Sequence, residues 1–397
     1  MITSEKIQNA KLKKPSFGHI NDDNNNDNND NDNVNIINTN ITHSNRIVLS
    51  NKDIIELEDY NYHIIEQIGR GSFSNVYEAN KYIKINHGYE KGEKGEEENG
   101  EEDKLGQVKT KVICNNRELA LKFYKNNKIF QKSAITELNF LIHLKNNNIE
   151  NNIIQYIDYF SLNSHICIVF EKYDMDLYKY YSKYIKPSKI KKENYSFLLK
   201  SITLGLSYLK NKNIINTDLK PENIFVNLDK SKFAHKNKEY PFKNIVISDF
   251  SSAIKMNIPV KYYNLTSLWY RAPEIYFKIK NLNFIDIWSF GCILYELWYS
   301  EPLFCLHEPN YEKNNISLQN NHILKIGYMP KDFLKSNYIK DELIVKPRFF
   351  HSHKQSKYYK TKFDSIPYPE IIRKILVWEP TKRITPEEIL RIIDAYR

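Results

Sequence analysis

The chain has 397 residues, of which 41% are hydrophobic and 13% aromatic, and its formal net charge is +10. This length and apolar content exclude a chain that is disordered throughout and allow one large core or two smaller ones. The basic residues are scattered along the sequence, so we interpret the charge as a solvated basic surface and expect no direct contact with nucleic acid.

The cysteines and the apolar runs of the sequence indicate the cellular compartment of the protein. The four cysteines lie far apart without a CxxC pair, which favours a reducing compartment, the nucleus and/or the cytoplasm, over a disulfide framework. The polar N-terminus leads us to expect no signal peptide. The most apolar stretch, residues 284–304, is interrupted by Asp286 and Glu296 and predicts a buried helix, not a membrane span.

Two polar tracts interrupt the chain. Residues 21–45 are mostly Asn and Asp, which bury too little apolar surface to offset the entropy of ordering, so we expect residues 1–58 to form a disordered extension. Residues 87–107 are rich in Glu, Gly and Lys and predict a surface insertion, which a loop tolerates at small entropic cost. Residues 59–397 should form the folded domain.

The folded part changes character along its length. Periodicity predicts strands over residues 62–68, 76–79, 119–124 and 165–170. Residues 133–144 have helical spacing, and helical patterns dominate from Tyr195 onward. This order predicts an α+β fold with two lobes, a strand-rich one of residues 59–171 and a helical one of residues 172–397.

A glycine-rich turn joins the first two predicted strands. Glycines let the backbone turn tightly and approach phosphate oxygens, although a structural turn would look the same and Ser74 replaces a third glycine. The residues expected to line a nucleotide here are Ile68, Gly69, Arg70, Gly71, Ser72, Phe73, Ser74 and Val76.

Three further motifs carry charged groups suited to phosphate chemistry. The strand that contains Ala120 ends in Lys122, and an ion pair with Glu137 on the next helix would hold its amine against the phosphates. In the segment from Asn216 to Asn223, Asp218 can accept the proton of an attacking hydroxyl and Lys220 can neutralise the moving phosphoryl group. Asn223 and, after an apolar run, Asp249 offer oxygen ligands to a metal ion.

The order and spacing of these motifs resemble the protein kinase superfamily from about Asp59 to Arg397. The resemblance implies a two-lobed kinase fold that binds ATP and Mg²⁺, with Mn²⁺ as an alternative. It implies that Glu274 pairs with Arg383 and that Asp286 anchors the catalytic loop. Phe170 would be the gatekeeper, and adenine would bond to the backbone of Glu171 and Tyr173.

Residues 268–274 (LWYRAPE) are similar to the CMGC group of kinases, because Arg271 precedes the Ala-Pro-Glu triplet. Ser267 and Arg271 would then contact the protein substrate. Thr217 before the catalytic Asp, together with the segment Asp249-Phe250-Ser251-Ser252-Ala253, resembles the cdc2-like and SR-protein kinases. That branch implies a Ser/Thr kinase, with dual specificity as an option, acting on Ser/Arg-rich splicing factors.

Departures from the family pattern keep two alternatives open. Asn216 replaces a usual His and Ser251 a usual Gly, which would fit a pseudokinase scaffold. The hallmark segment of cdc2-like kinases is missing near residues 322–327, which leaves a DYRK-like kinase as the other alternative.

Regulation can also be predicted from the resemblance. Thr136, Thr217 and Ile254 occupy the positions where a cyclin-dependent kinase supplies cations for a loop phosphate, and Asn264 stands in place of a regulatory tyrosine. We therefore expect a monomer that acts on protein substrates without a cyclin or a membrane.

Overall fold

The protein is described here from a computed structural model, which covers residues 40–41, 46–57, 59–86, 110–145, 151–186, 189–232, 240–258, 265–305, 311–337, 339 and 352–396. The chain divides into two compact units, one of residues 1–135 with 155–172 and one of residues 136–154 with 173–397. The first boundary falls within helix α2 (Lys128–Leu144).

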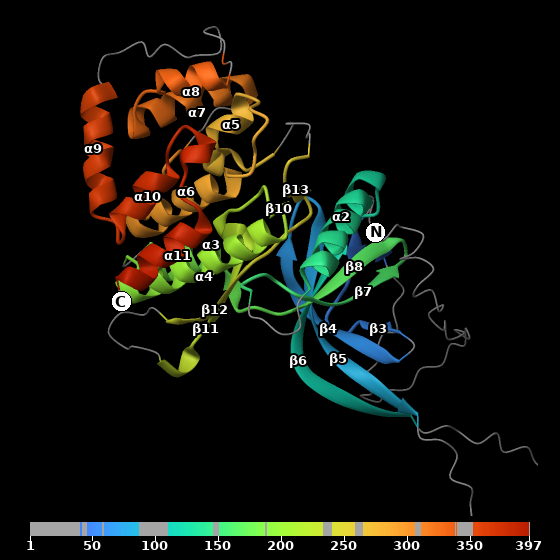
Figure 1. Ribbon diagram of the computed structural model, residues 1–397. Coiled ribbons are helices and arrows are strands. Elements are labelled where there is room, and N and C mark those ends of the chain that lie inside the picture. Colours follow the sequence, from blue (N-terminus) through green and yellow to red (C-terminus); the bar gives the residue numbers. More distant parts are fainter. Residues whose placement is uncertain are drawn as a thin grey trace, which may run out of the picture. The chain divides into compact units, whose positions relative to one another are not determined.

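The first unit is built on a six-stranded antiparallel sheet with the strand order β3-β4-β5-β6-β8-β7 (Figure 1). The strands are β3 (Ile54–Glu56), β4 (Tyr60–Arg70), β5 (Ser74–Asn86), β6 (Thr110–Tyr124), β7 (Tyr156–Leu162) and β8 (His165–Glu171). All four predicted strands form, and the helix predicted over residues 133–144 lies within α2.

The hairpin of β5 and β6 is longer than its apolar residues predict. The two strands pair from Ser74 opposite Tyr124 to Asn86 opposite Thr110. The predicted insertion over residues 87–107 lies outside the described residues, between the ends of these two strands.

The sheet of the first unit curls on itself. Tyr60 and Tyr62 of β4 both donate hydrogen bonds to the Asp158 carboxylate of β7, the latter at 3.2 Å. The Tyr62 ring also stacks on Phe160 with centroids 5.6 Å apart. Because three strands separate β4 from β7 in the sheet order, these contacts require a strongly curved sheet, which encloses the apolar core of this unit.

The expectation of a disordered extension up to residue 58 is wrong for residues 46–57. Ile47 and Leu49 are 1% and 7% exposed and, with Ile55, belong to the apolar core of the first unit. Strand β2 (Ile47–Val48) pairs with β1 (Asn40–Ile41), and β3 pairs with β4. These apolar residues follow the Asn/Asp tract directly, and their burial offsets the entropy of ordering that the tract itself cannot offset.

The second unit is mainly helical. Its helices after α2 are α3 (Leu177–Tyr180), α4 (Lys192–Asn211), α5 (Pro273–Tyr276), α6 (Ile285–Tyr299), α7 (Tyr311–Ile326), α8 (Lys331–Ser336), α9 (Ser352–Asp364), α10 (Pro369–Ile375) and α11 (Pro386–Ala395). Two small sheets complete it. They consist of β12 (Phe242–Ile247), β11 (Ile224–Leu228) and β9 (Met175–Asp176), and of β10 (Ile214–Ile215) with β13 (Ile254–Lys255).

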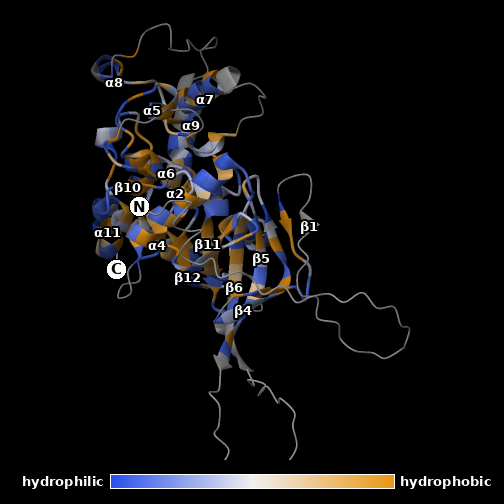
Figure 2. Cartoon of the chain, turned by 90° about the vertical axis from the view of Figure 1, so that its right-hand side faces the viewer, coloured by the Kyte–Doolittle hydropathy of each residue, from blue (hydrophilic) through white to orange (hydrophobic). Residues whose placement is uncertain are grey.

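Helix α6 lies at the centre of the second unit. Every residue from Ile285 to Leu297 is buried, and the apolar composition of this helix appears as orange in Figure 2. The buried helix predicted within residues 284–304 is thus confirmed. Over the part of the chain that the structure describes, no helix combines the length and the apolar character needed to cross a membrane.

Candidate active site

Asp218, the predicted general base, is held by hydrogen bonds on both carboxylate oxygens. Its Oδ2 accepts from Lys220 Nζ at 2.6 Å, and its Oδ1 accepts from Ser267 Oγ at 2.7 Å and from Ser267 N at 3.1 Å. Asn223 Nδ2 donates to the Asp218 carbonyl oxygen at 2.8 Å. The Asp218 side chain remains 25% exposed, so this fixed carboxylate can still meet a hydroxyl that approaches from outside.

Asp286, in the first turn of α6, anchors the loop that carries Asp218. Its carboxylate accepts hydrogen bonds from the backbone N–H groups of Asn216 at 2.7 Å and Thr217 at 3.0 Å. Burial raises the pKa of Asp286 to about 6, although the two backbone bonds act to lower it. The anchoring role that the resemblance implied for this residue is confirmed by these contacts.

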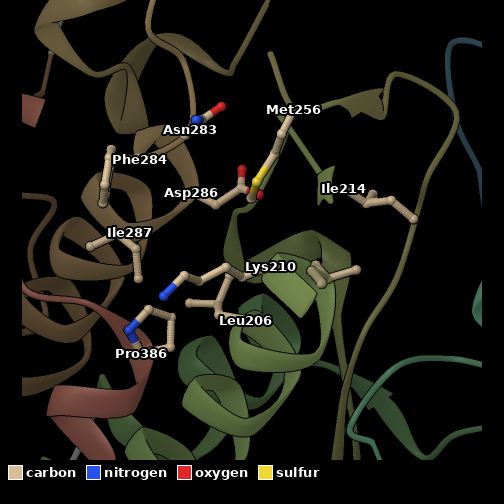
Figure 3. Close-up of a pocket in the computed structure, with 10 residues that line it drawn as sticks. Leu206, Lys210, Ile214, Met256, Asn283, Phe284, Asp286, Ile287 and Pro386 are labelled. Atoms are coloured by element: carbon tan, nitrogen blue, oxygen red, sulfur yellow. The ribbon is translucent and has the colours of Figure 1, made fainter. Parts of the chain in front are cut away.

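A pocket of about 120 Å³ borders Asp286 within the second unit (Figure 3). Its lining is mostly apolar and comes from α4, β10, the segment after β13, α6 with the two residues before it, and Pro386 at the start of α11. Asp218, Lys220 and Asn223 are not among the lining residues. This pocket is therefore separate from the reactive cluster.

Asn216 occupies the position where the kinase pattern has His. Its Nδ2 donates to the carbonyl oxygens of Ser248 at 3.1 Å and Asp249 at 3.0 Å. The amide thus ties the catalytic loop to the segment of the predicted metal ligand. The replacement of His by Asn216 suggested a pseudokinase scaffold, yet Asn216 still connects the two segments.

The two predicted metal ligands lie on segments that are joined by hydrogen bonds. The Asn223 carbonyl oxygen accepts from Ser248 N at 2.8 Å and from Ser248 Oγ at 2.9 Å, and Asp249 is the next residue. Asn223 Nδ2 is engaged by Asp218, so the amide oxygen is the atom that Asn223 would offer to a cation. A carboxylate and an amide oxygen are hard donors, so this set fits a divalent cation of the Mg²⁺ type.

Thr217 holds the segment after Asp249 with neutral hydrogen bonds. Its Oγ1 donates to the Ser252 carbonyl oxygen at 3.0 Å and also lies 3.1 Å from Ser252 Oγ. Thr217 has a φ of 71°, which is unusual for a β-branched residue and indicates that the surrounding bonds impose its conformation. Ser251 is not among the residues with positive φ, so its replacement of a glycine demands no left-handed backbone here.

The glycine turn of the first unit has the tight form that the sequence predicts. Gly71 N donates to the Ser74 carbonyl oxygen at 2.8 Å, and a Cβ on Gly69 would lie 3.3 Å from Val76 Cβ. The tip formed by Gly71, Ser72 and Phe73 is exposed. In the next strand Lys122 is the register partner of Val76, so the predicted phosphate-binding amine belongs to the same sheet as the turn.

Other predicted nucleotide contacts are divided between the two units. Phe170 is buried on β8 opposite Ala120, and Glu171 is exposed at the end of that strand. In the second unit Glu137 Oε1 accepts from Phe250 N at 3.2 Å, and Tyr173 packs against a neighbouring aromatic ring. The predicted Lys122–Glu137 ion pair would join the units and stays a prediction.

The predicted substrate-binding residues differ in their surroundings. Ser267 belongs to the Asp218 cluster, whereas Arg271 is buried and donates through Nη2 to the Thr266 carbonyl oxygen at 3.0 Å. Arg271 Nη1 also donates to Asn315 Oδ1 at 3.4 Å on α7. Arg271 thus braces the backbone next to Ser267, where Thr266 has a φ of 63°.

Two buried acidic groups support the helical unit around this site. Arg383 forms a two-pronged ion pair with Glu274 at 2.5 and 2.7 Å, and both side chains are fully buried, as the resemblance implied. Glu296 on α6 accepts from Tyr270 Oη at 2.7 Å. Burial raises the pKa of Glu296 to about 7, and the negative charge of Glu222 adds to this effect.

Sequence reasoning missed two contacts near the site. Ser252 is the partner of Thr217, and Arg46, assigned to the disordered extension, binds the glycine turn through the Gly71 carbonyl oxygen at 3.0 Å. The apolar residues that follow Arg46 were the only sequence signal for order in this segment.

A strand-rich unit, a helical unit and an Asp218 carboxylate fixed by hydrogen bonds are the features expected of a phosphotransferase. Residues 100–392 match the family described as "Protein kinase domain". The chain therefore belongs to the protein kinase family, whose members use ATP and divalent metal ions. The predicted α+β kinase fold and the membership of the protein kinase family are confirmed.

Known proteins similar to this chain agree with that family. Dual specificity tyrosine-phosphorylation-regulated kinase 2 of Drosophila melanogaster is 27% identical over 85% of this chain and 42% of its own length. Serine/threonine-protein kinase prpf4B of Dictyostelium discoideum is 27% identical over 71% of this chain and 37% of its own length. This chain thus spans less than half of either relative.

A crystal structure of a kinase domain has the same fold, with a TM-score of 0.63 at 24% identity, covering 83% of this chain and 94% of that chain. The relatives support the CMGC group, and a DYRK-like kinase fits them as well as a cdc2-like one. The cdc2-like or SR-protein branch stays a prediction.

Proposed function

We propose that this protein is an active kinase of the CMGC group that transfers the γ-phosphate of ATP to Ser and Thr hydroxyls of proteins. The observation that supports it best is the Asp218 cluster, in which Lys220, Ser267 and Asn223 fix the carboxylate. Asp218 would accept the hydroxyl proton while Lys220 offsets charge on the transferred group. Asn223 and Asp249 would hold Mg²⁺, or Mn²⁺, which neutralises phosphate charge when bound.

A direct assay separates this enzyme from a pseudokinase scaffold. Purified protein is incubated with labelled ATP, Mg²⁺ and a generic basic protein, in parallel with the Asp218→Asn variant. We expect phosphate incorporation by the wild type alone, and phosphoamino acid analysis should show Ser and Thr. Equal incorporation by both proteins would mean that a contaminant is responsible, and none by either would favour the scaffold.

Within the group we propose Ser/Arg-rich splicing factors as substrates, because Thr217 is typical of cdc2-like and SR-protein kinases. A DYRK-like kinase with dual specificity is the second candidate, favoured by the similarity to the Drosophila relative. A peptide array distinguishes the two. Preference for Arg-Ser repeats supports the first, and a preference for other sequences together with phosphotyrosine supports the second.

The setting of this activity is also a proposal. We propose a monomer that works in the nucleus and/or the cytoplasm and needs no cyclin, since the positions that would read a loop phosphate hold Thr136, Thr217 and Ile254. Size-exclusion chromatography of the active protein, with light scattering, tests the monomer. A dimer that alone carries the activity would contradict it.

A further inference from the structure

The segment that precedes β3 packs against the strands of the glycine turn. The Ile47 carbonyl oxygen accepts from Tyr77 Oη at 3.2 Å and from Asn75 Nδ2 at 3.1 Å, and Leu49 N donates to Tyr77 Oη at 3.3 Å. Asn75 and Tyr77 are 5% and 0% exposed. Buried hydrogen bonds of this kind fix the segment firmly, because breaking one leaves a polar group unsatisfied in the core.

This packing places Arg46 beside the glycine turn. Its Nη2 donates to the Gly71 carbonyl oxygen at 3.0 Å, and its Nη1 donates to Asn75 Oδ1 at 3.3 Å. The turn itself is closed by the bond from Gly71 N to the Ser74 carbonyl oxygen. The guanidinium thus connects the tip of the turn to the start of β5. Its planar, rigid set of N–H donors is well suited to bonding two acceptors at once.

Positive charge gathers around the same turn. Lys125 N donates to the Phe73 carbonyl oxygen at 3.0 Å, which ties the tip to the end of β6. Desolvation lowers the pKa of Lys125, and the positive charges of Arg46 and Arg70 lower it further, so Lys125 lies in the field of both guanidinium groups. Such a group of like charges is relieved by an anion, and the ligand of a kinase glycine turn carries a triphosphate.

We propose that Arg46 is a positioning residue for ATP, fixing the glycine turn of residues 69–74 in the conformation that receives the phosphates. The inference rests on the proposed binding of ATP by this turn. A glycine turn has many accessible conformations, and a guanidinium that is bonded to Gly71 in the turn and to Asn75 just after it reduces the entropy lost when the nucleotide binds. Residues 46–57 then contribute to the nucleotide site through Arg46.

Kinetics and direct binding of Arg46→Ala test the proposal. We expect the KM for ATP to rise about tenfold, the effect of one lost charge-assisted hydrogen bond. A fluorescent ATP analogue, titrated without turnover, should bind more weakly by the same factor. The KM for the protein substrate and the Tm without nucleotide should stay close to wild type, because Arg46 is only partly buried.

Three further variants serve as comparisons. Arg46→Lys keeps the charge without the fork and should recover only part of the affinity. Lys132→Ala removes one positive charge from an exposed site on α2. It should change neither the KM for ATP nor the affinity for the ATP analogue. Deletion of residues 1–39, which retains Arg46 and β1, should also be neutral.

Two results would overturn the proposal. One is an ATP affinity of Arg46→Ala within about twofold of wild type. The other is an equal change in the KM for ATP and the KM for the protein substrate together with a lower Tm, which would indicate a packing role. If Arg46→Ala fails to fold, Arg46→Lys is judged by the same criteria. A wild type that binds the analogue but transfers no phosphate would contradict the proposed function and leave this inference standing.

Discussion

Two residues of the predicted catalytic loop, Asn216 and Thr217, differ from the usual kinase pattern. Both nevertheless connect this loop to the segment that contains Asp249. Asn216 bonds the carbonyl oxygens of Ser248 and Asp249, the latter a predicted metal ligand, and Thr217 bonds the Ser252 backbone with its hydroxyl. Both loops therefore remain connected without an imidazole or a guanidinium. The replacement of His by Asn216 and of Arg by Thr217 removes ionisable side chains from this loop. Asp218 is nevertheless fixed by its bonds to Lys220, Ser267 and Asn223.

Asp218→Asn tests the role of the carboxylate itself. An amide keeps the size of the side chain but accepts a proton poorly, so we expect turnover to fall roughly 10²–10⁴-fold. Binding of the ATP analogue and the Tm should be nearly unchanged. Turnover within a few-fold of wild type in the peptide assay would show that another group takes the proton.

Glu296→Gln tests a buried charge. Its pKa is raised from 4.5 to about 7, so the folded protein binds this proton more tightly than the unfolded chain. The stability that this group contributes is therefore present below pH 4.5 and is lost as the pH rises through 7. A Gln at this position can still accept from Tyr270 Oη, so we expect the variant to be more stable than wild type at pH 8 by on the order of 2 kcal/mol.

The measurement is urea unfolding of both proteins at pH 8 and near pH 5, where the difference should shrink. Glu301→Gln is the matched control, because Glu301 is half exposed and pairs with Lys362 at 2.7 Å. It should give no gain at pH 8. A Glu296 variant that is less stable at both pH values would show that the carboxylate is needed in its charged form.

Which residues could be predicted depends on the range of their contacts. Asp218, Asn223 and Asp249 stand in short motifs whose spacing is fixed by local backbone chemistry, so the sequence was sufficient to propose them. Arg46 contacts residues 25 and 29 positions away and belongs to no motif. Its role depends on a tertiary arrangement that periodicity does not encode.

At the scale of elements, the apolar pattern located the strands but not their lengths. The predicted strand over residues 76–79 became β5, which continues to Asn86 because β6 pairs with it as far as Thr110, with one register shift between Asn80 and Tyr82. Hydrogen bonding to a neighbour extends a strand into polar sequence, where alternation is weak. Helix α6 was predictable because its apolar run is too long for a typical strand, so a buried helix is the structure that fits it best.

Gly291 on α6 packs directly against the end of α10. A Cβ there would lie 2.5 Å from Ile375 Cγ2 and 3.1 Å from Leu376 Cδ2. Gly291→Ala gains about 1 kcal/mol of helix propensity but must displace both side chains, so we expect a net loss of about 1–2 kcal/mol in stability. Chemical denaturation measures it.

Gly71→Ala is the control for stability alone, since a Cβ at Gly71 would meet only Ser74 O at 3.7 Å. Its free energy of unfolding should stay within about 0.5 kcal/mol of wild type. If Gly291→Ala were as stable as this control, the core around Ile375 would have to be looser than its contacts indicate.

At the scale of the whole molecule, protein kinases are commonly controlled through the ordering of the loop that follows the metal-binding Asp, which is Asp249 in this sequence. In this protein the start of that segment is held by Thr217 and by the β10–β13 pairing of Ile215 with Ile254. These contacts are made by a hydroxyl and by backbone groups, none of which is charged. Residues 259–264, which include Tyr262 and Tyr263, lie outside the described part of the chain.

We therefore predict that protein treated with phosphatase retains most of its kinase activity and needs no cyclin-like subunit. A phosphate orders a loop by pairing with cations at prepared positions, and Thr136, Thr217 and Ile254 offer none. Initial rates are measured before and after treatment, with mass spectrometry to confirm removal of phosphate. Thr217→Val provides the internal comparison, because loss of its hydroxyl bond to Ser252 should lower activity more than phosphatase does. A drop of tenfold or more on dephosphorylation, restored by phosphorylation within residues 255–266, would show that Lys255 or Lys261 takes the place of the missing arginines.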